Sequence, residues 1–210
     1  MSLPPESHPD ASSPEAIAAI VLAAGESSRM GTDKALLMYR GRTFLENIIS
    51  SLHDAGVRRV VIVLGHHAGL IQQRIDLSTV EFVVNQDYGR GQTSSLQAGL
   101  RALTGNEPNG VIVCLVDHPA FSVETARKLI QHFSFTGRSV VIPQIDGIHG
   151  HPVLLGRELF GKLLALGPHQ GADTVVHQYR GRTEFVDVAD PGILIDVDDP
   201  ESYRNLTTQE

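Results

Sequence analysis

The chain has 210 residues, with 17 lysines and arginines against 24 aspartates and glutamates, and 41% of its residues are hydrophobic. Such a composition is typical of a globular protein, and a net charge of −7 argues against broad nucleic-acid binding, which depends on basic side chains. A single cysteine, Cys114, excludes an intrachain disulfide framework and any metal site built from several cysteines.

The amino-terminal segment MSLPPESHPDASSPEA has neither the basic start nor the apolar stretch of a signal peptide. No apolar run in the chain approaches the ~20 residues that a membrane-spanning helix needs. We therefore expect a cytoplasmic protein with no membrane partner. Residues 1–15 are rich in proline, serine and acidic residues, which predicts a disordered tail, and residues 16–206 are expected to form one domain.

Short apolar runs recur along the chain, and their length and β-branched content predict buried strands. They span residues 16–22, 60–64, 80–84, 111–115 and 139–142. Helical spacing of apolar residues appears between them, at residues 43–55, 70–75, 93–103 and after Ser122. Thr43 and Glu46 form a capping box at the start of the first helix, Thr93 or Ser94 is expected to cap the third, and Ser122 the fourth.

Alternating strands and helices predict a three-layer α/β/α fold with a doubly wound, mostly parallel, Rossmann-like sheet in a single domain. Beyond residue 147 the pattern is less regular, and we expect antiparallel strands there at an edge of the sheet. Ligands of such sheets bind beyond the carboxyl ends of the strands, which directs attention to the residues that follow each strand.

The first strand is followed by the loop LAAGESSRMGTDK, residues 22–34. Small residues at its start allow a ligand to approach the backbone closely, and its amide groups can surround an anion. Arg29 and Lys34 add two cations, so the loop favours a polyphosphate ligand over the alternative of a flexible surface turn. It matches neither a Walker A loop nor the dinucleotide G-x-G-x-x-G pattern.

Asp117 ends the apolar segment GVIVCLVDHP, residues 110–119. A carboxylate next to a buried strand is costly unless it binds a cation or accepts several hydrogen bonds, so a Mg²⁺ ligand is the favoured role. The alternative is that Asp117 caps the turn at Pro119.

These motifs resemble the signature of nucleotidyltransferases that make NDP-sugars, CDP-alcohols and dinucleotide forms of the molybdenum cofactor. The likeness is greatest to the MobA/MocA-like molybdenum cofactor nucleotidyltransferase family. The resemblance implies that Arg29 and Lys34 hold the triphosphate, and that the base and ribose lie against Leu22, Ala23, Ala24 and Gly25. LAAG is typical of the cytidylyltransferase branch and LAGG of the guanylyltransferase branch, so Ala24 favours CTP over GTP.

The same resemblance covers the other motifs in family order. The segment GILIDVDDPESYRNL, residues 192–206, resembles the family's closing segment and implies that Asp196, or alternatively Asp198, is a second Mg²⁺ ligand beside Asp117. Because Asp196 follows the apolar run 193–195, we expect it to be placed as Asp117 is. Asp199, Pro200 and Glu201 have the character of a helix start.

Two further segments match the family. GRGQTSSLQAGL, residues 89–100, corresponds to a helix start near the nucleotide base and implies contacts from Ser94 and Ser95. GIHGHPVLLGRELF, residues 147–160, resembles the acceptor side and implies that Gly150 and Pro152 shape its wall. One departure is Asp173, where relatives usually carry arginine, and it should weaken recognition of an anionic group there.

Together these features predict a Mg²⁺-dependent enzyme that transfers CMP from CTP to the phosphate of molybdopterin and releases pyrophosphate, with Arg29, Lys34 and Asp117 as its catalytic residues. The alternatives are a cytidylyltransferase for a sugar or polyol phosphate, a guanylyltransferase that uses GTP, and a nucleotide-binding module that delivers the cofactor without turnover. A molybdoenzyme or its chaperone is a further partner that the resemblance suggests.

Overall fold

The computed structural model describes residues 17–105 and 108–208. The tail predicted for residues 1–15 lies outside this part of the chain. Among the described residues, no helix is both long enough and apolar enough to cross a membrane.

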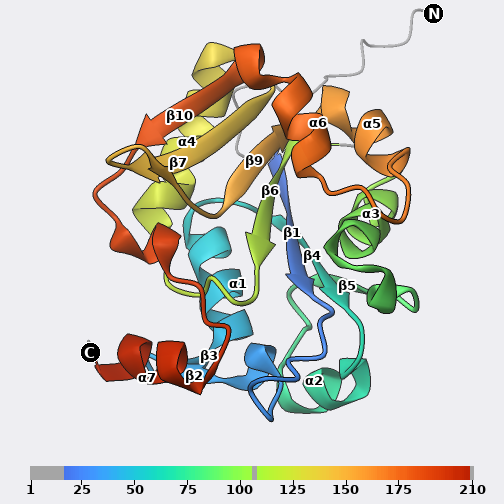
Figure 1. The fold of residues 1–210 in the computed structure, drawn as a ribbon, viewed down its shortest axis with the longest axis vertical. Coiled ribbons are helices and arrows are strands. Elements are labelled where there is room, and N and C mark those ends of the chain that lie inside the picture. Colours follow the sequence, from blue (N-terminus) through green and yellow to red (C-terminus); the bar gives the residue numbers. More distant parts are fainter. Residues whose placement is uncertain (1–16, 106–107, 209–210) are drawn as a thin grey trace, which may run out of the picture.

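A central sheet organises the molecule, with strand order β10-β7-β9-β6-β1-β4-β5 and β8 attached to β7 (Figure 1). The strands β1, β4, β5 and β6 run parallel to one another, as does the separate pair β7 and β10. Their bounds are β1 Ile17–Ala23, β4 Arg59–Leu64, β5 Glu81–Val84, β6 Gly110–Leu115, β7 Val140–Ile145, β8 Ile148–His149, β9 Val153–Gly156 and β10 Thr183–Asp187. A small antiparallel pair, β2 (Met38–Tyr39) and β3 (Arg42–Thr43), forms a second sheet.

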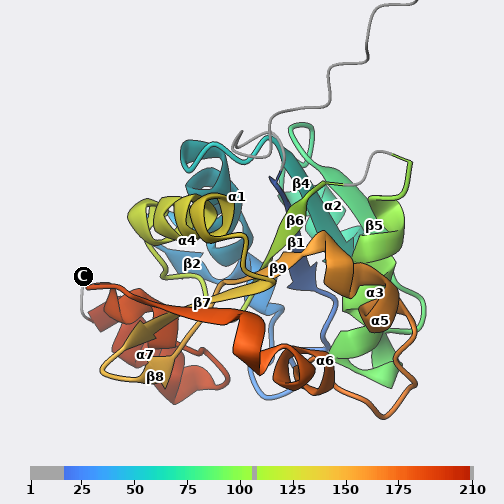
Figure 2. The ribbon, with the colours of Figure 1, turned by 90° about the horizontal axis from the view of Figure 1, so that it is seen from above.

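Helices cover both faces of the central sheet, and Figure 2 shows α1 and α4 on one side and α3 and α5 on the other. One layer contains α1 (Phe44–Asp54), α2 (Ala68–Arg74) and α4 (Val123–Thr136), joined by Leu206 of α7 (Pro200–Thr208). The other contains α3 (Gln92–Ala102), α5 (Phe160–Leu164) and α6 (Asp173–Gln178). Every residue of β1 is buried, and its side chains alternate between the two layers. The predicted three-layer, single-domain α/β fold is confirmed.

The predicted antiparallel strands are present, but their placement at an edge is wrong for β9. This strand lies inside the sheet, antiparallel to both β6 and β7, and so joins the two parallel groups. Leu154 and Leu155 of β9 are buried on opposite faces, which gives the insertion a role in both cores. The edge positions belong instead to β5 and β10.

The prediction that residues 80–84 form a buried strand is also wrong in part. A strand forms, but β5 is an edge strand whose Phe82 and Val84 are 42% and 39% exposed. Residues 193–195 form no strand at all, because Ile193 belongs to a 3₁₀ turn, η6 (Pro191–Leu194), that Asp190 caps. Asp196 is therefore placed by a loop, unlike Asp117, which follows a parallel strand.

Helix starts follow the sequence predictions in two of three cases. Thr43 and Glu46 form both bonds of the capping box on α1, and the Ser122 hydroxyl accepts the Thr125 amide hydrogen at the start of α4. The start of α3 differs: Gly91, with φ of 92°, is its N-cap and provides no side chain. The hydroxyl of Ser94, one of the expected caps, donates instead to backbone carbonyls.

Short 3₁₀ turns complete the chain and place several side chains near the site. They are η2 (Lys34–Leu36), η3 (Tyr88–Arg90), η4 (Arg157–Leu159) and η5 (Arg180–Arg182).

Cys114 is buried in β6, and burial raises the pKa of its thiol. The cysteine is thus a core residue in this fold.

Candidate active site

A cleft of about 290 Å³ lies at the carboxyl ends of β1 and β6. Parallel strands end together at this edge of the sheet, so the loops that follow them surround one space. Most of the residues that the sequence assigned to nucleotide binding line this cleft, namely Leu22, Ala23, Ala24, Gly25, Arg29, Lys34 and Ser95. Asp117, the predicted metal ligand, lines it too.

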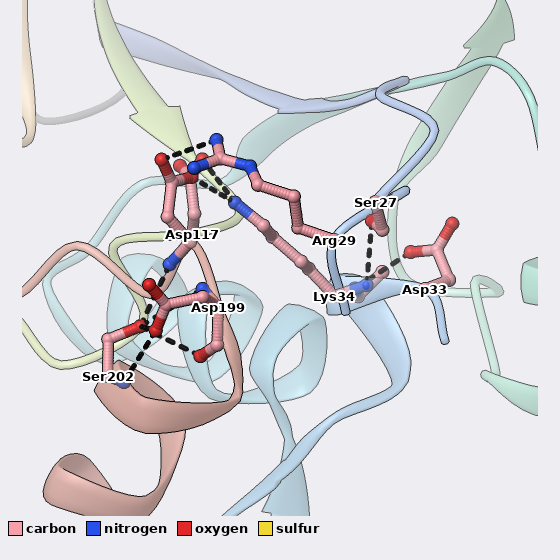
Figure 3. Close-up of polar contacts among 9 residues, drawn as sticks. Ser27, Arg29, Asp33, Lys34, Asp117, Asp199 and Ser202 are labelled. Carbon is pink, nitrogen blue, oxygen red and sulfur yellow. Dashed lines mark hydrogen bonds and ion pairs between the residues drawn. The ribbon is translucent and has the colours of Figure 1, made fainter. Parts of the chain in front are cut away.

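The loop after β1 presents open backbone toward the cleft. A Cβ atom at Gly25 would meet no heavy atom within 4 Å, so the space beside this residue is free for a ligand. Ser27 adopts a positive φ of 53°, and its hydroxyl accepts the backbone amide hydrogen of Lys34 at 3.0 Å. This contact closes the loop, and Figure 3 shows Ser27 beside the backbone of Lys34.

Asp33 anchors the end of the loop, a role that the sequence analysis did not predict. It is 4% exposed, and its carboxylate accepts the Ala35 amide hydrogen at 2.8 Å as the N-cap of η2. The other carboxylate oxygen lies 3.0 Å from Nδ1 of His67, which follows β4. An aspartate directly before a helical turn is the sequence signal for such a cap, whereas the histidine partner is 34 residues away.

Two cations and two carboxylates meet at the mouth of the loop (Figure 3). The Lys34 Nζ atom lies 2.6 Å from Asp198 Oδ1 and 3.1 Å from Asp117 Oδ2, and the Arg29 guanidinium lies 2.7 Å from Asp198 Oδ2. Figure 3 shows the Lys34 side chain extending from η2 toward Asp117 at the end of β6. Asp198, which the resemblance implied as an alternative metal ligand, is here the partner of both cations.

The charges in this cluster support one another. Burial of Lys34 opposes its charged form, but its hydrogen bond to Asp198 and the charge of Asp117 outweigh burial and raise the pKa of Lys34. The hydrogen bond from Lys34, aided by Arg29, lowers the pKa of Asp198. Lys34 and Asp198 therefore both carry their charges at neutral pH.

Asp117 and Asp196, the two predicted metal ligands, are brought together in the structure. With His118 they form a group whose potential ligand atoms all lie within 4.8 Å of one another. Partial burial raises the pKa of Asp196, and the neighbouring charge of Asp117 raises it further. Carboxylate oxygens are the donors that Mg²⁺ prefers, so these residues fit a hard divalent cation. The contribution of His118 was not predicted.

The two predicted serines of α3 differ in position. Ser95 is buried and lines the cleft, but Ser94 is not among the lining residues, because its hydroxyl is engaged with the carbonyls of Asp87 and Gly91. The buried Asn85 donates to both serine hydroxyls, at 2.9 Å and 3.1 Å. In this structure the Ser94 hydroxyl thus bonds within the start of α3, and its contact with a nucleotide stays a prediction.

A second cavity of about 220 Å³ adjoins the cleft and shares Leu22, Gln92 and Leu115 with it. We call it the side cavity. His151 lines it, and burial together with the nearby His118 lowers the pKa of His151 to about 4, so that its ring is neutral at pH 7. The rings of His118 and His151 lie 4.7 Å apart between centroids. This pair connects the side cavity to the carboxylates of the cleft.

Gly150 and Pro152, which the resemblance places at the acceptor side, lie next to residues that line the side cavity. Gly150 packs against the backbone of Ile193, where a Cβ atom would collide with its carbonyl, and the His151 amide hydrogen is donated to that carbonyl at 3.0 Å. Gly150 and Pro152 do not line the cleft or the side cavity, whereas the neighbouring His151 and Val153 line the latter. Gly150 is thus a packing residue that holds η6 near the site.

Comparison with protein families identifies the chain. Residues 19–183 match the family described as the MobA-like NTP transferase domain. The chain belongs to this family. It is therefore a nucleotidyltransferase by family, and the match includes most of β1, the loop that follows it, and Asp117.

Named relatives differ in what they act on. The nicotine blue oxidoreductase of Paenarthrobacter nicotinovorans is 32% identical, over 90% of this chain and 96% of its own length. A probable molybdenum cofactor guanylyltransferase of Opitutus terrae is 35% identical over 63% of this chain and 62% of its own length. The molybdenum cofactor cytidylyltransferase of Escherichia coli is 25% identical over 93% and 96%.

Solved structures share the fold over nearly the whole chain. The Rv0371c protein of Mycobacterium tuberculosis superposes with a TM-score of 0.79 and 31% identity, covering 91% of this chain and 97% of its own. A manganese complex of the same protein superposes with a TM-score of 0.76 and 28% identity, covering 92% and 99%. A divalent cation is thus present in a member of this structural group.

Proposed function

We propose that this nucleotidyltransferase moves CMP from CTP to the phosphate of molybdopterin and releases pyrophosphate. The observation that carries the proposal is the position of Lys34, whose ammonium group joins the small-residue loop after β1 to the carboxylates of Asp117 and Asp198. The choice of molybdopterin as the acceptor is supported by the relatives that are named for molybdenum cofactor guanylyl and cytidylyl transfer. The LAAG sequence of the loop supports CTP.

In this reaction a phosphate oxygen of the acceptor attacks the α-phosphorus of CTP. The new P–O bond forms as the bond between the α-phosphorus and its bridging oxygen to the β-phosphate breaks, and pyrophosphate leaves with that oxygen. Such a transfer depends on positioning and on charge neutralisation, because no covalent intermediate is needed. Lys34 and Arg29 are placed to neutralise charge that develops on the pyrophosphate.

Asp117 and Asp196, with His118 beside them, would hold a divalent cation, which we propose is Mg²⁺. When bound, the cation supplies Lewis-acid polarisation of the α-phosphate. The chain's own residues supply the rest: the backbone around Gly25 receives the nucleotide, and Lys34 leaves Asp198 for a phosphate oxygen. We also propose that Asp198 acts as the partner of these cations until the triphosphate replaces it.

The proposal is tested by pyrophosphate release from each of CTP and GTP, with molybdopterin or an alditol phosphate as acceptor and with Mg²⁺ or Mn²⁺. We expect the highest kcat/KM for CTP with molybdopterin and Mg²⁺. A preference for GTP would move the chain to the guanylyltransferase alternative, and turnover of the alditol phosphate with molybdopterin inert would contradict the acceptor.

Two further outcomes would contradict the transfer reaction itself. CTP binding without pyrophosphate release from any acceptor would favour the cofactor-delivery module. Reduction of a dye by a nicotinamide cofactor, with no nucleotidyl transfer, would favour a redox role like that named for the Paenarthrobacter nicotinovorans relative. Transfer to a molybdoenzyme or its chaperone stays a prediction.

A further inference from the structure

The side cavity is mostly apolar, with a few polar side chains in its wall. Its apolar lining includes Leu96, Val113, Val153, Leu155 and Val176. Four polar side chains also line it: that of Thr93, whose hydroxyl donates to the Gln170 carbonyl at 2.8 Å, and those of Gln92, His151 and Asp173. An apolar cavity with a few converging polar groups is the usual form of a binding site for a small organic molecule.

Within residues 17–105 and 108–208, the side chains of Gln92, His151 and Asp173 each present a polar group that has no hydrogen-bond or ion-pair partner. The Asp173 carboxylate and the Gln92 amide make no side-chain bond in the described structure, and the buried Nδ1 atom of His151 is unpaired. The Nδ1 atom of His151 is buried, so leaving it unpaired is costly, and a ligand that bonds with it removes the cost. The side chains of Gln92 and Asp173 line the cavity but are exposed, so they are available to a ligand that enters from solvent.

The chain makes room for the Asp173 carboxylate. One of its oxygens lies so close to Gly171 that a Cβ atom there would collide with it. Asp173 is the first residue of the short helix α6. A carboxylate at this position accepts hydrogen bonds and disfavours an anionic occupant of the cavity.

We propose that the side cavity holds the fused ring of the acceptor and that Asp173 recognises neighbouring N–H donors on the ring edge. This inference rests on the proposed function, which makes the acceptor a pterin. The 2-amino group and N3–H of a pterin lie side by side and match the two oxygens of one carboxylate. Gln92 supplies a donor for the adjacent ring carbonyl.

The location suits transfer to the acceptor's phosphate. The side cavity shares Leu22, Gln92 and Leu115 with the nucleotide cleft, and His151 in its wall contacts His118 beside Asp117. A ring in the cavity therefore lies next to the carboxylate group where the acceptor's phosphate must meet CTP. The cavity itself contains no cation among its lining residues, which agrees with a neutral ring rather than a phosphate as its occupant.

Two phosphate-free, fluorescent ring compounds test the proposal by affinity alone. Pterin carries the 2-amino group, whereas lumazine carries a carbonyl at the same position and would repel the carboxylate. We expect the wild-type protein, with CTP and Mg²⁺ present, to bind pterin roughly tenfold more tightly than lumazine. Asp173→Asn should remove this preference, while the matched control Glu124→Gln, on α4 at the opposite face of the sheet, should keep it.

A second variant tests the cavity without touching Asp173. Val176→Phe fills the cavity and should abolish binding of both ring compounds while CTP affinity is unchanged. Equal affinity for pterin and lumazine in the wild type, a preference that survives Asp173→Asn, or displacement of pterin by cytidine would each overturn the proposal. Measuring pyrophosphate release separates failure of this proposal from failure of the proposed function. A preference for pterin over lumazine without any nucleotidyl transfer would contradict the proposed function. Nucleotidyl transfer without that preference would contradict the proposed role of the side cavity.

Discussion

At the scale of single residues, the site depends on partners far apart in the sequence. Arg29, Lys34 and Asp117 are predictable, because each belongs to a local motif directly after a buried strand. The pairing of Lys34 with Asp198 is not, because 164 residues separate them and only the fold brings η2 and the loop before α7 together. Ser94 was expected as a possible cap of α3, but Gly91 is the N-cap and the Ser94 hydroxyl donates to its carbonyl, a local choice that the sequence pattern does not decide.

Asp117 provides the first prediction. The Asp117 carboxylate belongs to the proposed cation site and also pairs with Lys34, and Asp117→Asn removes its charge. We therefore expect kcat to fall by about 10²-fold or more. The side chain is 29% exposed and hydrogen-bonded at the cleft, so the fold should survive. Pyrophosphate release and thermal unfolding measure the two effects. Asp146→Asn, in the exposed turn between β7 and β8, is the matched control, and near-normal activity of Asp117→Asn would refute the metal assignment.

Asp198 provides a prediction about pH. Because its folded-state pKa is lowered, its charge stabilises the native state above the ordinary aspartate value of about 3.9, and the contribution is lost as the pH falls through that region. Asp198→Asn should therefore lower the free energy of unfolding at neutral pH, by less than about 1 kcal/mol because the side chain is 39% exposed.

As the pH falls from about 3.9, the ordinary aspartate value, toward the lowered folded-state pKa of Asp198, this contribution fades, so the stabilities of the wild type and Asp198→Asn should approach each other between pH 7 and an acidic pH of about 3. Urea unfolding at the two pH values measures the difference. A constant difference between the two proteins at both pH values would contradict the charge pairing seen in the structure.

At the scale of elements, the periodicity of apolar residues predicted where strands lie along the chain, but it did not predict which strands pair with one another. Apolar runs located β1, β4, β6 and β7 because parallel strands in the middle of a sheet must be buried on both faces. The same rule overestimated the burial of β5, since nothing in an apolar run says that its strand lies at an edge. The insertion of β9 between β6 and β7 is a matter of pairing partners, which the pattern along one strand does not contain.

The capping box on α1 provides a prediction at this scale. Thr43 accepts the Glu46 amide hydrogen, and the Glu46 carboxylate accepts the Thr43 amide hydrogen. Thr43→Ala should lower the free energy of unfolding by about 1 kcal/mol, because the start of α1 loses a partner. Chemical unfolding measures it, with Thr43→Ser as the control that keeps the hydroxyl. Equal stability of the alanine and serine variants would show that the cap contributes nothing.

At the scale of the whole molecule, the acidic total and the cationic site have to be considered together. A net charge of −7 repels an anionic nucleotide, so binding must come from the local arrangement of Lys34 and Arg29 in the loop. The chain neutralises these cations with Asp198 and Asp117, which keeps the loop ordered. The proposed reaction requires Lys34 and Arg29 to leave these carboxylates and bind the phosphates of the nucleotide instead.

The fold class and the position of the cleft followed from the order of elements, because alternating strands and helices leave few topologies and place ligands at one edge of the sheet. The side cavity did not follow. Gln92, His151 and Asp173 come from three different segments. The resemblance relates residues 147–160 to the acceptor side, but only the fold shows that these three side chains line one cavity.

Transfer of the nucleotidyl group to the acceptor's phosphate can be followed directly with labelled CTP during a single turnover with molybdopterin. We expect label at the α-phosphate to appear in a dinucleotide product and label at the γ-phosphate to leave in pyrophosphate. Label at the α-phosphate that stays in CTP or appears only as free CMP, with no labelled dinucleotide, would contradict this transfer.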